Sequence, residues 1–101
     1  MAELATLARP YAEALFKAVS VSEAQSAATQ LSELAQVASD ERLKAFADNP
    51  RTTVDQVFEV ITSATKSVIG ARVKNLLRVV IENGRTHALP EIAAQFKALV
   101  N

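Results

Sequence analysis

The feature that most constrains how this chain folds is the width of the apolar face on two of its helical segments. At about 100° per residue, the apolar side chains between Leu4 and Val19 fill about 200° of a helix. Those between Ala71 and Asn83 fill an arc of similar width, again about 200°. A surface helix packed on one core needs only a little more than about 100°. Both segments are therefore expected either to lie centrally in a bundle or to keep one edge for a partner.

Composition excludes several functional classes. The chain has 101 residues, half of them hydrophobic and only 5% aromatic, so its core must be built from Leu, Val, Ile and Ala. Its 11 Lys and Arg balance 11 Asp and Glu, which argues against a nucleic-acid partner. Without cysteine there is no disulfide or thiol chemistry. No apolar run approaches the roughly 18 residues of a membrane span, so direct membrane insertion is not expected.

Helical periodicity and its punctuation predict an all-α fold, a single six-helix bundle over residues 1–101. The predicted helices cover residues 4–19, 23–38, 41–47, 54–67, 71–83 and 90 to the chain end. Pro10 lies in the opening turns of the first helix and predicts a slight bend or a frayed start. The predicted N-caps are Ser22 for the second helix and Ser39 or Asp40 for the third, and a capping box, Thr53–Gln56, opens the fourth. Gly84 is predicted to end the fifth helix, and Pro90 to begin the sixth.

Two helices have a predicted core stripe. In the fourth helix the stripe is Val54, Val57, Phe58, Ile61, Ala64 and Val68. In the sixth helix it is Ile92, Ala93, Phe96, Leu99 and Val100. Because both sets follow the helical period, they are expected to face the inside of the bundle.

Residues that could support catalysis or bind a metal are sparse, and we predict no catalytic residue, metal or cofactor. The single histidine, His87, has no second His and no Cys with which to bind a metal. Two carboxylate pairs, Asp40 with Glu41 and Asp55 with Glu59, are interpreted as helix-start or solvent-face charges. No glycine-rich loop could cradle a phosphate.

A modest basic run remains to be explained. It consists of Arg72, Lys74, Arg78 and Arg85. We interpret it as the solvated polar face of the fifth helix rather than a nucleic-acid stripe, because Glu82 balances it.

The surplus apolar surface favours a binding module without an active site. Its natural ligand would be an amphipathic helix laid into a groove between the two wide helices. Tyr11, in the middle of the first arc, suits either a core edge or an interface, and the residues leave this open.

Two segments resemble a known family. The segment ARPYAEALF at residues 8–16 resembles the start of the δ subunit of bacterial F-type ATP synthase, called OSCP in mitochondria. The segment VKNLLRVVIENGRTHALP at residues 73–90 is similar to that family's signature between its fifth and sixth helices. The resemblance covers the whole chain. It implies that residues 1–101 are an N-terminal, F1-binding domain of six helices, and that the family's C-terminal domain is absent.

The resemblance implies a structural, non-catalytic subunit of the stator, which holds the F1 head to the peripheral stalk at the cytoplasmic face of the bacterial inner membrane. The expected partner is the amphipathic N-terminal helix of the α subunit, with the stalk b subunit bound through the missing C-terminal domain. The implied contact residues are Tyr11, Ala14, Leu15, Leu76, Val79 and Asn83. Leu7, Ala8 and Ala18 are expected to extend the groove, and Val73, Leu77 and Ile81 to serve the core.

Two alternatives come from other classes. One is an RNA-binding helical domain of the antitermination-factor type, which would need a basic face. The other is a small helical enzyme, which the motifs do not support. Salt separates the first alternative from a helix-binding groove, because phosphate-dominated binding weakens steeply with salt whereas an apolar groove is nearly indifferent.

Overall fold

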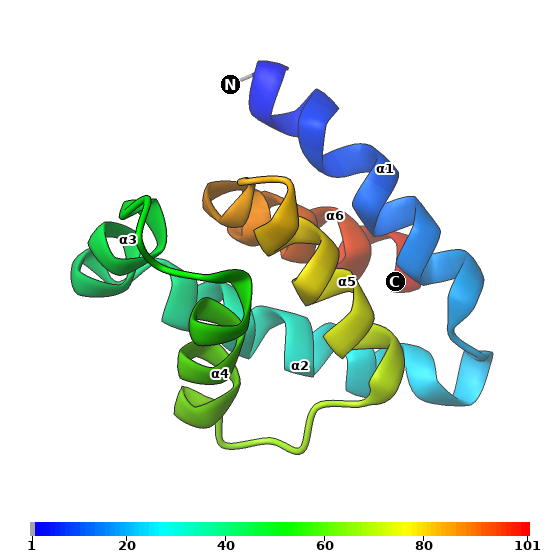
Figure 1. Cartoon of the computed structure of the whole chain (residues 1–101). Helices are drawn as coiled ribbons and strands as arrows, with labels where there is room; N and C mark the ends of the chain where they lie inside the picture. The colour runs from blue at the N-terminus through cyan, green and yellow to red at the C-terminus, as the bar shows by residue number, and fades with distance from the viewer. Residues whose placement is uncertain (1) are drawn as a thin grey trace.

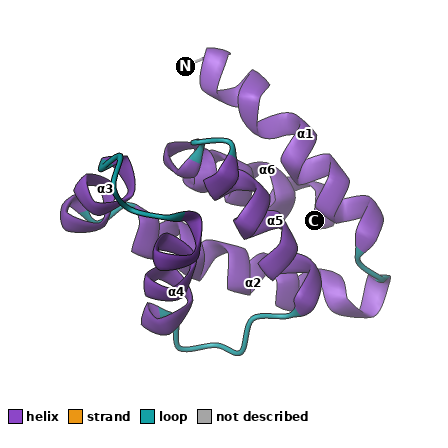
Figure 2. Cartoon of the chain, viewed as in Figure 1, coloured by secondary structure: helices purple, strands orange, loops and turns teal. Residues whose placement is uncertain are grey.

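The computed structural model describes residues 2–101, and their secondary structure is helical (Figure 1). The helices are α1 (Ala2–Ala18), α2 (Val21–Ala38), α3 (Glu41–Asp48), α4 (Val54–Ala64), α5 (Ala71–Glu82) and α6 (Leu89–Val100), with a 3-10 turn, η1 (Thr86–Ala88), before α6. No strand occurs in this part of the chain (Figure 2), so the all-α, six-helix prediction is confirmed. Met1, which the predicted domain includes, lies outside the described residues.

The bundle is organised around α6. Its contacts with α1 and α2 are the most extensive between any two helices of the fold. Its inward side chains Leu89, Ile92 and Phe96 have no exposed surface. The Phe96 ring meets that of Phe16 on α1 edge to face, with centroids 6.4 Å apart. The predicted core face of the sixth helix is therefore correct at its centre.

Leu99 was predicted to lie on that core face and does not. Its side chain is 41% exposed. It lies in the last turn of α6, one residue before the helix ends at Val100. Periodicity identifies the arc but not how far along it the neighbouring helices extend.

Helix starts and stops follow local side-chain chemistry. Asp40 accepts hydrogen bonds from the backbone N–H groups of Arg42 and Leu43, at 2.8 and 3.3 Å, and caps α3 as predicted. Thr53 and Gln56 form the predicted reciprocal capping box on α4. The predicted cap of α2 is wrong by two residues. Ser20 is the N-cap, because its N–H donates to the Glu23 carboxylate at 3.1 Å.

The end of α5 is a Schellman motif, as its glycine predicts. Gly84 has φ of +68°, a conformation that a residue with a Cβ adopts only at a cost. The N–H of Gly84 donates to the Ile81 carbonyl, and that of Arg85 to the Val80 carbonyl. Pro10 does not interrupt the first helix, because α1 runs through it as one helix from Ala2 to Ala18.

α4 is three residues shorter than predicted, ending at Ala64. The hydroxyls of Thr62, Ser63 and Thr65 donate to backbone carbonyls three or four residues earlier, which competes with continuing the helix. Val68, predicted in the core stripe, therefore lies in the following loop and is 90% exposed. Val57 and Ile61 are buried as predicted, Val54 and Phe58 are half-buried, and Ala64, also predicted in the stripe, is exposed.

The loop after α4 is held by α2 instead. The Glu33 carboxylate accepts from the backbone N–H of Lys66 and from the Ser67 hydroxyl. Three residues before it, Gln30 accepts from the N–H of Gly70 at 2.9 Å. These contacts fix the point at which α5 begins.

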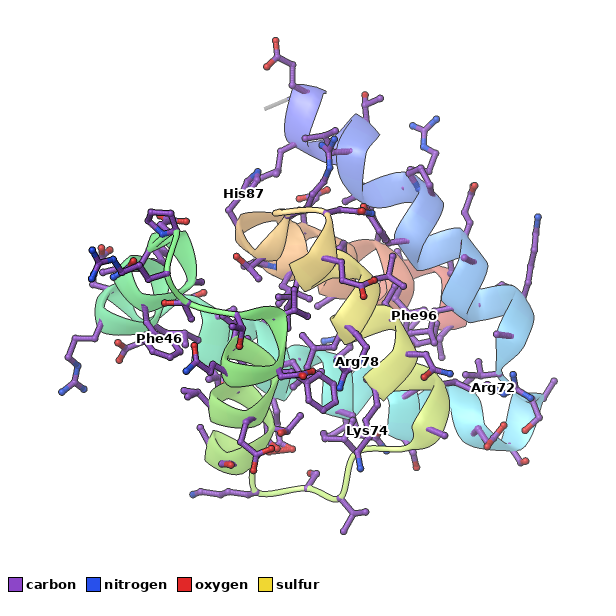
Figure 3. All side chains as sticks on the ribbon, viewed as in Figure 1. Phe46, Arg72, Lys74, Arg78, His87 and Phe96 are labelled. Carbon is purple, nitrogen blue, oxygen red and sulfur yellow. The ribbon has the colours of Figure 1, made fainter. Side chains whose placement is uncertain are left out.

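Arg78 ties α5 to α4. Its guanidinium donates to the Asp55 carboxylate at 2.6 Å and lies 4.4 Å from the centroid of the Phe58 ring. Figure 3 shows the Arg78 side chain pointing from α5 toward α4. Asp55 lies in the first turn of α4 with its side chain 84% exposed, as predicted, but the interpretation of Arg78 as part of a solvated face missed that it bridges α5 to α4.

Replacing Phe96 tests whether α6 is the centre of the core. Because its ring is fully buried, Phe96→Ala should lower the free energy of unfolding by about 3–5 kcal/mol. The matched control, Val68→Ala, removes an exposed side chain and should change it by less than about 0.5 kcal/mol. Denaturant unfolding measures both. Equal effects would show that the centre of the core is misassigned.

The link between α2 and the loop should make stability sensitive to acid. The Ser67 hydroxyl, and then the Lys66 N–H, hold the pKa of Glu33 below its ordinary value of 4.5. A carboxyl with a lowered folded-state pKa stabilises the fold above its unfolded-state pKa and loses that effect as pH falls through the folded-state value. In thermal melts from pH 7 to pH 3, Glu33→Gln should therefore lose less stability than the parent chain. A fall as large as the parent's would contradict this role of Glu33.

Candidate functional site

α1 and α5 lie side by side and run in opposite directions (Figure 1), and each presents a stripe of side chains to the hollow between them. The α1 stripe is Leu7, Tyr11, Ala14 and Ala18. The α5 stripe is Arg72, Leu76, Val79 and Asn83. Both stripes have the spacing i, i+4, i+7, i+11, which keeps them on one side of each helix. We call the hollow the α1–α5 groove.

The main part of the groove has a volume of about 400 Å³ and an apolar lining. Leu15 and Leu76, 3% and 9% exposed, form its floor. Val79 stands at its wall with 43% of its surface exposed. Ala14 and Ala18 on α1 are exposed and small, so the opposite wall is low. The groove exists because two alanines face a leucine and a valine.

A polar pair lies where the groove continues toward the end of α5. The Asn83 side-chain amide donates to the Tyr11 hydroxyl at 2.9 Å, which joins the two helices. Tyr11 lines both parts of the groove, and Leu7 and Asn83 line the second part. The Tyr11 ring is half-buried, and its hydroxyl oxygen accepts from Asn83, so its O–H can still donate. Tyr11 packs against the core and also lines the groove, so its position fits both interpretations left open for it, the core edge and the interface.

The structure brings all six predicted contact residues to this groove. Tyr11, Ala14, Leu15, Leu76 and Val79 line its main part, and Asn83 its continuation. Leu7 and Ala18 extend it, as expected. Ala8 does not extend it, because its side chain is completely buried against the core.

The division of α5 into two edges is only partly correct. Val73, Leu77 and Ile81 are buried as predicted, but so are Leu76 and Val80. Helices α1, α2 and α4 all contact α5, so most of its wide arc is covered. Val79 is the large apolar side chain of α5 that remains substantially exposed. Leu76 is therefore a floor residue shared with the core, rather than a free edge.

Charge along the groove is sparse and of one sign. Arg72 lines the end beside Ala18, and Arg85 lines the end beside Leu7. No Asp or Glu is among the residues that line either part of the groove. The sequence interpretation grouped Arg72 and Arg85 with a solvated face and missed that they border the groove.

No metal-binding cluster is found in residues 2–101. These residues contain no group of three or more His, Cys, Asp or Glu that could hold a metal ion. His87 lies exposed in η1 (Figure 3). Asp40 is engaged as a helix cap, and the backbone N–H of Arg42, followed by that of Leu43, lowers its pKa. None of the helices described is both long and apolar enough to cross a membrane.

A second apolar groove, which the sequence interpretation did not predict, lies among α2, α3 and α4. It has a volume of about 510 Å³ and is lined by Gln36, Val37, Asp40, Arg42, Leu43, Phe46, Val60 and Ala64. Phe46 and Val60 are 36% and 43% exposed. Val60 is an apolar residue outside the core stripe predicted for the fourth helix. An apolar side chain on the outer face of that helix was a sequence signal for this groove.

The fold and the α1–α5 groove define a small all-α domain that presents an apolar groove between two antiparallel helices. The family model for the ATP synthase delta (OSCP) subunit matches residues 7–101. The chain belongs to this family.

Curated relatives agree with the family model. The chain is 55% identical over 101 residues to the ATP synthase subunit delta of Methylibium petroleiphilum, and 58% identical over 101 residues to that of a Polaromonas species. It is 50% identical over 103 residues to that of Delftia acidovorans. Each match covers all of this chain but only 57%, 57% and 58% of the relative, respectively.

Proposed function

We propose that this chain is the N-terminal, F1-binding domain of a δ subunit, and that it binds the amphipathic N-terminal helix of the α subunit in the α1–α5 groove. The observation that carries the proposal is the groove itself. Two helix stripes, apolar at their centre, flank a hollow that the chain's own side chains leave open. Family membership supports a partner within the ATP synthase, and the geometry of the groove supports this place for it.

The groove has the shape that a helix needs. From Arg72 to Asn83 the α5 stripe spans about 17 Å at 1.5 Å per residue, which is about three turns of a bound helix. An apolar groove of this kind recognises side chains at i, i+3, i+4 and i+7 of an amphipathic helix. Val79 is the exposed anchor on its wall, and Tyr11 supplies a ring together with a hydroxyl that can donate.

The role that follows is structural rather than catalytic. As the domain that grips F1, the chain would form part of the stator and hold the head against the turning rotor. It would act as a peripheral component at the cytoplasmic face of the bacterial inner membrane. The stalk b subunit would bind the portion of a δ subunit that corresponds to the remaining length of the relatives.

The RNA-binding alternative lacks an observation in its favour. The net charge is zero. Arg78, one of the basic run, is engaged by Asp55 and Phe58. A basic, phosphate-tracking face therefore does not form along α5.

Introducing a negative charge at different positions of α5 should separate binding from folding. Val79→Glu places a carboxylate that is solvated in the free domain and buried without a partner in the complex. It should leave the melting temperature nearly unchanged and weaken binding of a peptide of the α-subunit N-terminus by at least about 100-fold. Ile81→Glu puts the charge in the core and should unfold the domain. Calorimetric titration and thermal melts measure both effects.

Two further variants sharpen this test. Leu76→Glu should destabilise the domain as well as weaken binding, since Leu76 is 9% exposed. Ala14→Trp fills the groove without a charge and should block the peptide, whereas Ala45→Trp, on the exposed face of α3, should not. Full binding by both Val79→Glu and Ala14→Trp would show that the α1–α5 groove is not the binding site.

A further inference from the structure

The α1–α5 groove is apolar at its centre and bounded by a guanidinium at each end. Arg72 lies on the α5 stripe itself, one turn before Leu76, beside Ala18 of α1. Arg85 lies past the end of α5, beside Leu7. Arg72 lies in the first turn of α5 and Arg85 follows the Schellman motif that ends it, so about three turns of helix separate them. A helix filling the groove would pass between them.

Arg72 forms no close ion pair within the described part of the fold. Among residues 2–101, no carboxylate lies within 4 Å of its guanidinium, whereas Arg78 on the same helix pairs with Asp55 at 2.6 Å. The pKa of Glu23 on α2 is lowered first by the Ser20 N–H, then by the Ser20 side chain, and least by the charge of Arg72. A cation in the first turn of a helix also opposes the helix dipole. Figure 3 shows Arg72 where the first turn of α5 meets the α1–α2 corner.

Arg85 is also unpaired but has a second role. No carboxylate among the described residues lies within 4 Å of its guanidinium. Its backbone N–H closes the Schellman motif on the Val80 carbonyl, so its charge lies at the C-terminal end of α5, where the helix dipole favours a cation. A variant at Arg85 must therefore be read for stability as well as for binding.

We propose that Arg72 and Arg85 select a partner helix whose apolar stripe is flanked by a carboxylate at each end, about three helical turns apart to match the length of α5. This rests on the proposed function and adds the charge pattern of the bound helix. The two guanidinium groups meet carboxylates only when the helix is in one register. Exposed ion pairs contribute little each, so their main effect is on register and on the choice of partner.

The test is a set of double-mutant cycles with a synthetic peptide of the α-subunit N-terminus. Arg72→Gln and Arg85→Gln should each weaken peptide binding about 1.5- to 5-fold at low salt, and the loss should shrink at high salt. A peptide whose flanking acids are changed to amides should bind the parent domain about as weakly as the unchanged peptide binds the double variant of Arg72→Gln and Arg85→Gln. The amide peptide should bind the double variant with almost the same affinity as it binds the parent domain, because the same ion pairs are missing in both complexes. Arg51→Gln, an exposed arginine outside the groove, should bind like the parent.

The outcomes distinguish this inference from the proposal on which it rests. If the double variant binds as tightly as the parent while Val79→Glu binds weakly, the groove binds the helix but the arginines do not read its charge. If the amide peptide and the arginine variants lose affinity independently, the pairing is wrong. If the parent domain does not bind the peptide at all, both proposals fail. Thermal melts of Arg85→Gln correct for its role at the end of α5.

Discussion

The interaction on which the rest of this fold depends is the burial of α6 between α1 and α2. Phe96, Ile92 and Leu89 are completely enclosed there, although α6 is the last helix of the chain. Because α6 fills the centre, α1 contributes only one edge, Ala8, Ala12 and Leu15, to the core. Its opposite edge is then left beside α5 with nothing to cover it. The groove is thus a consequence of where the last helix packs.

Small side chains and tethers shape that groove. Ala14 and Ala18 keep the α1 wall low, while Tyr11 and Asn83 join the helices across it at 2.9 Å. On its far side α5 is held by the Arg78–Asp55 bridge to α4, and its start is set by Gln30 and Glu33 of α2. A groove between two helices fixed on both sides requires little rearrangement when a partner helix enters it, which lowers the ordering cost of binding.

Much of this could be predicted from the sequence, since the relevant signals are local. The Thr53–Gln56 capping box, the Asp40 cap and the terminating Gly84 each act within a few residues. The free edge of α1 followed from the width of its apolar arc. What could not be predicted depends on contacts distant in sequence. Leu76 is buried because three helices contact α5, Val68 is exposed because Glu33 holds the loop after α4, and Arg78 is engaged by Asp55. Periodicity gives the width of an arc but not the number of neighbours that cover it.

The most direct measurement is an amide chemical-shift titration of the isotopically labelled domain with a peptide of the α-subunit N-terminus. Binding in the α1–α5 groove predicts the largest shifts at Ala14, Ala18, Val79 and Asn83, on the stripes of α1 and α5. The groove among α2, α3 and α4 serves as an internal control within the same spectra. Its amides, including those of Phe46 and Val60, should move little. Largest shifts at Phe46 and Val60, with α1 and α5 unchanged, would contradict the assignment of the α1–α5 groove as the binding site.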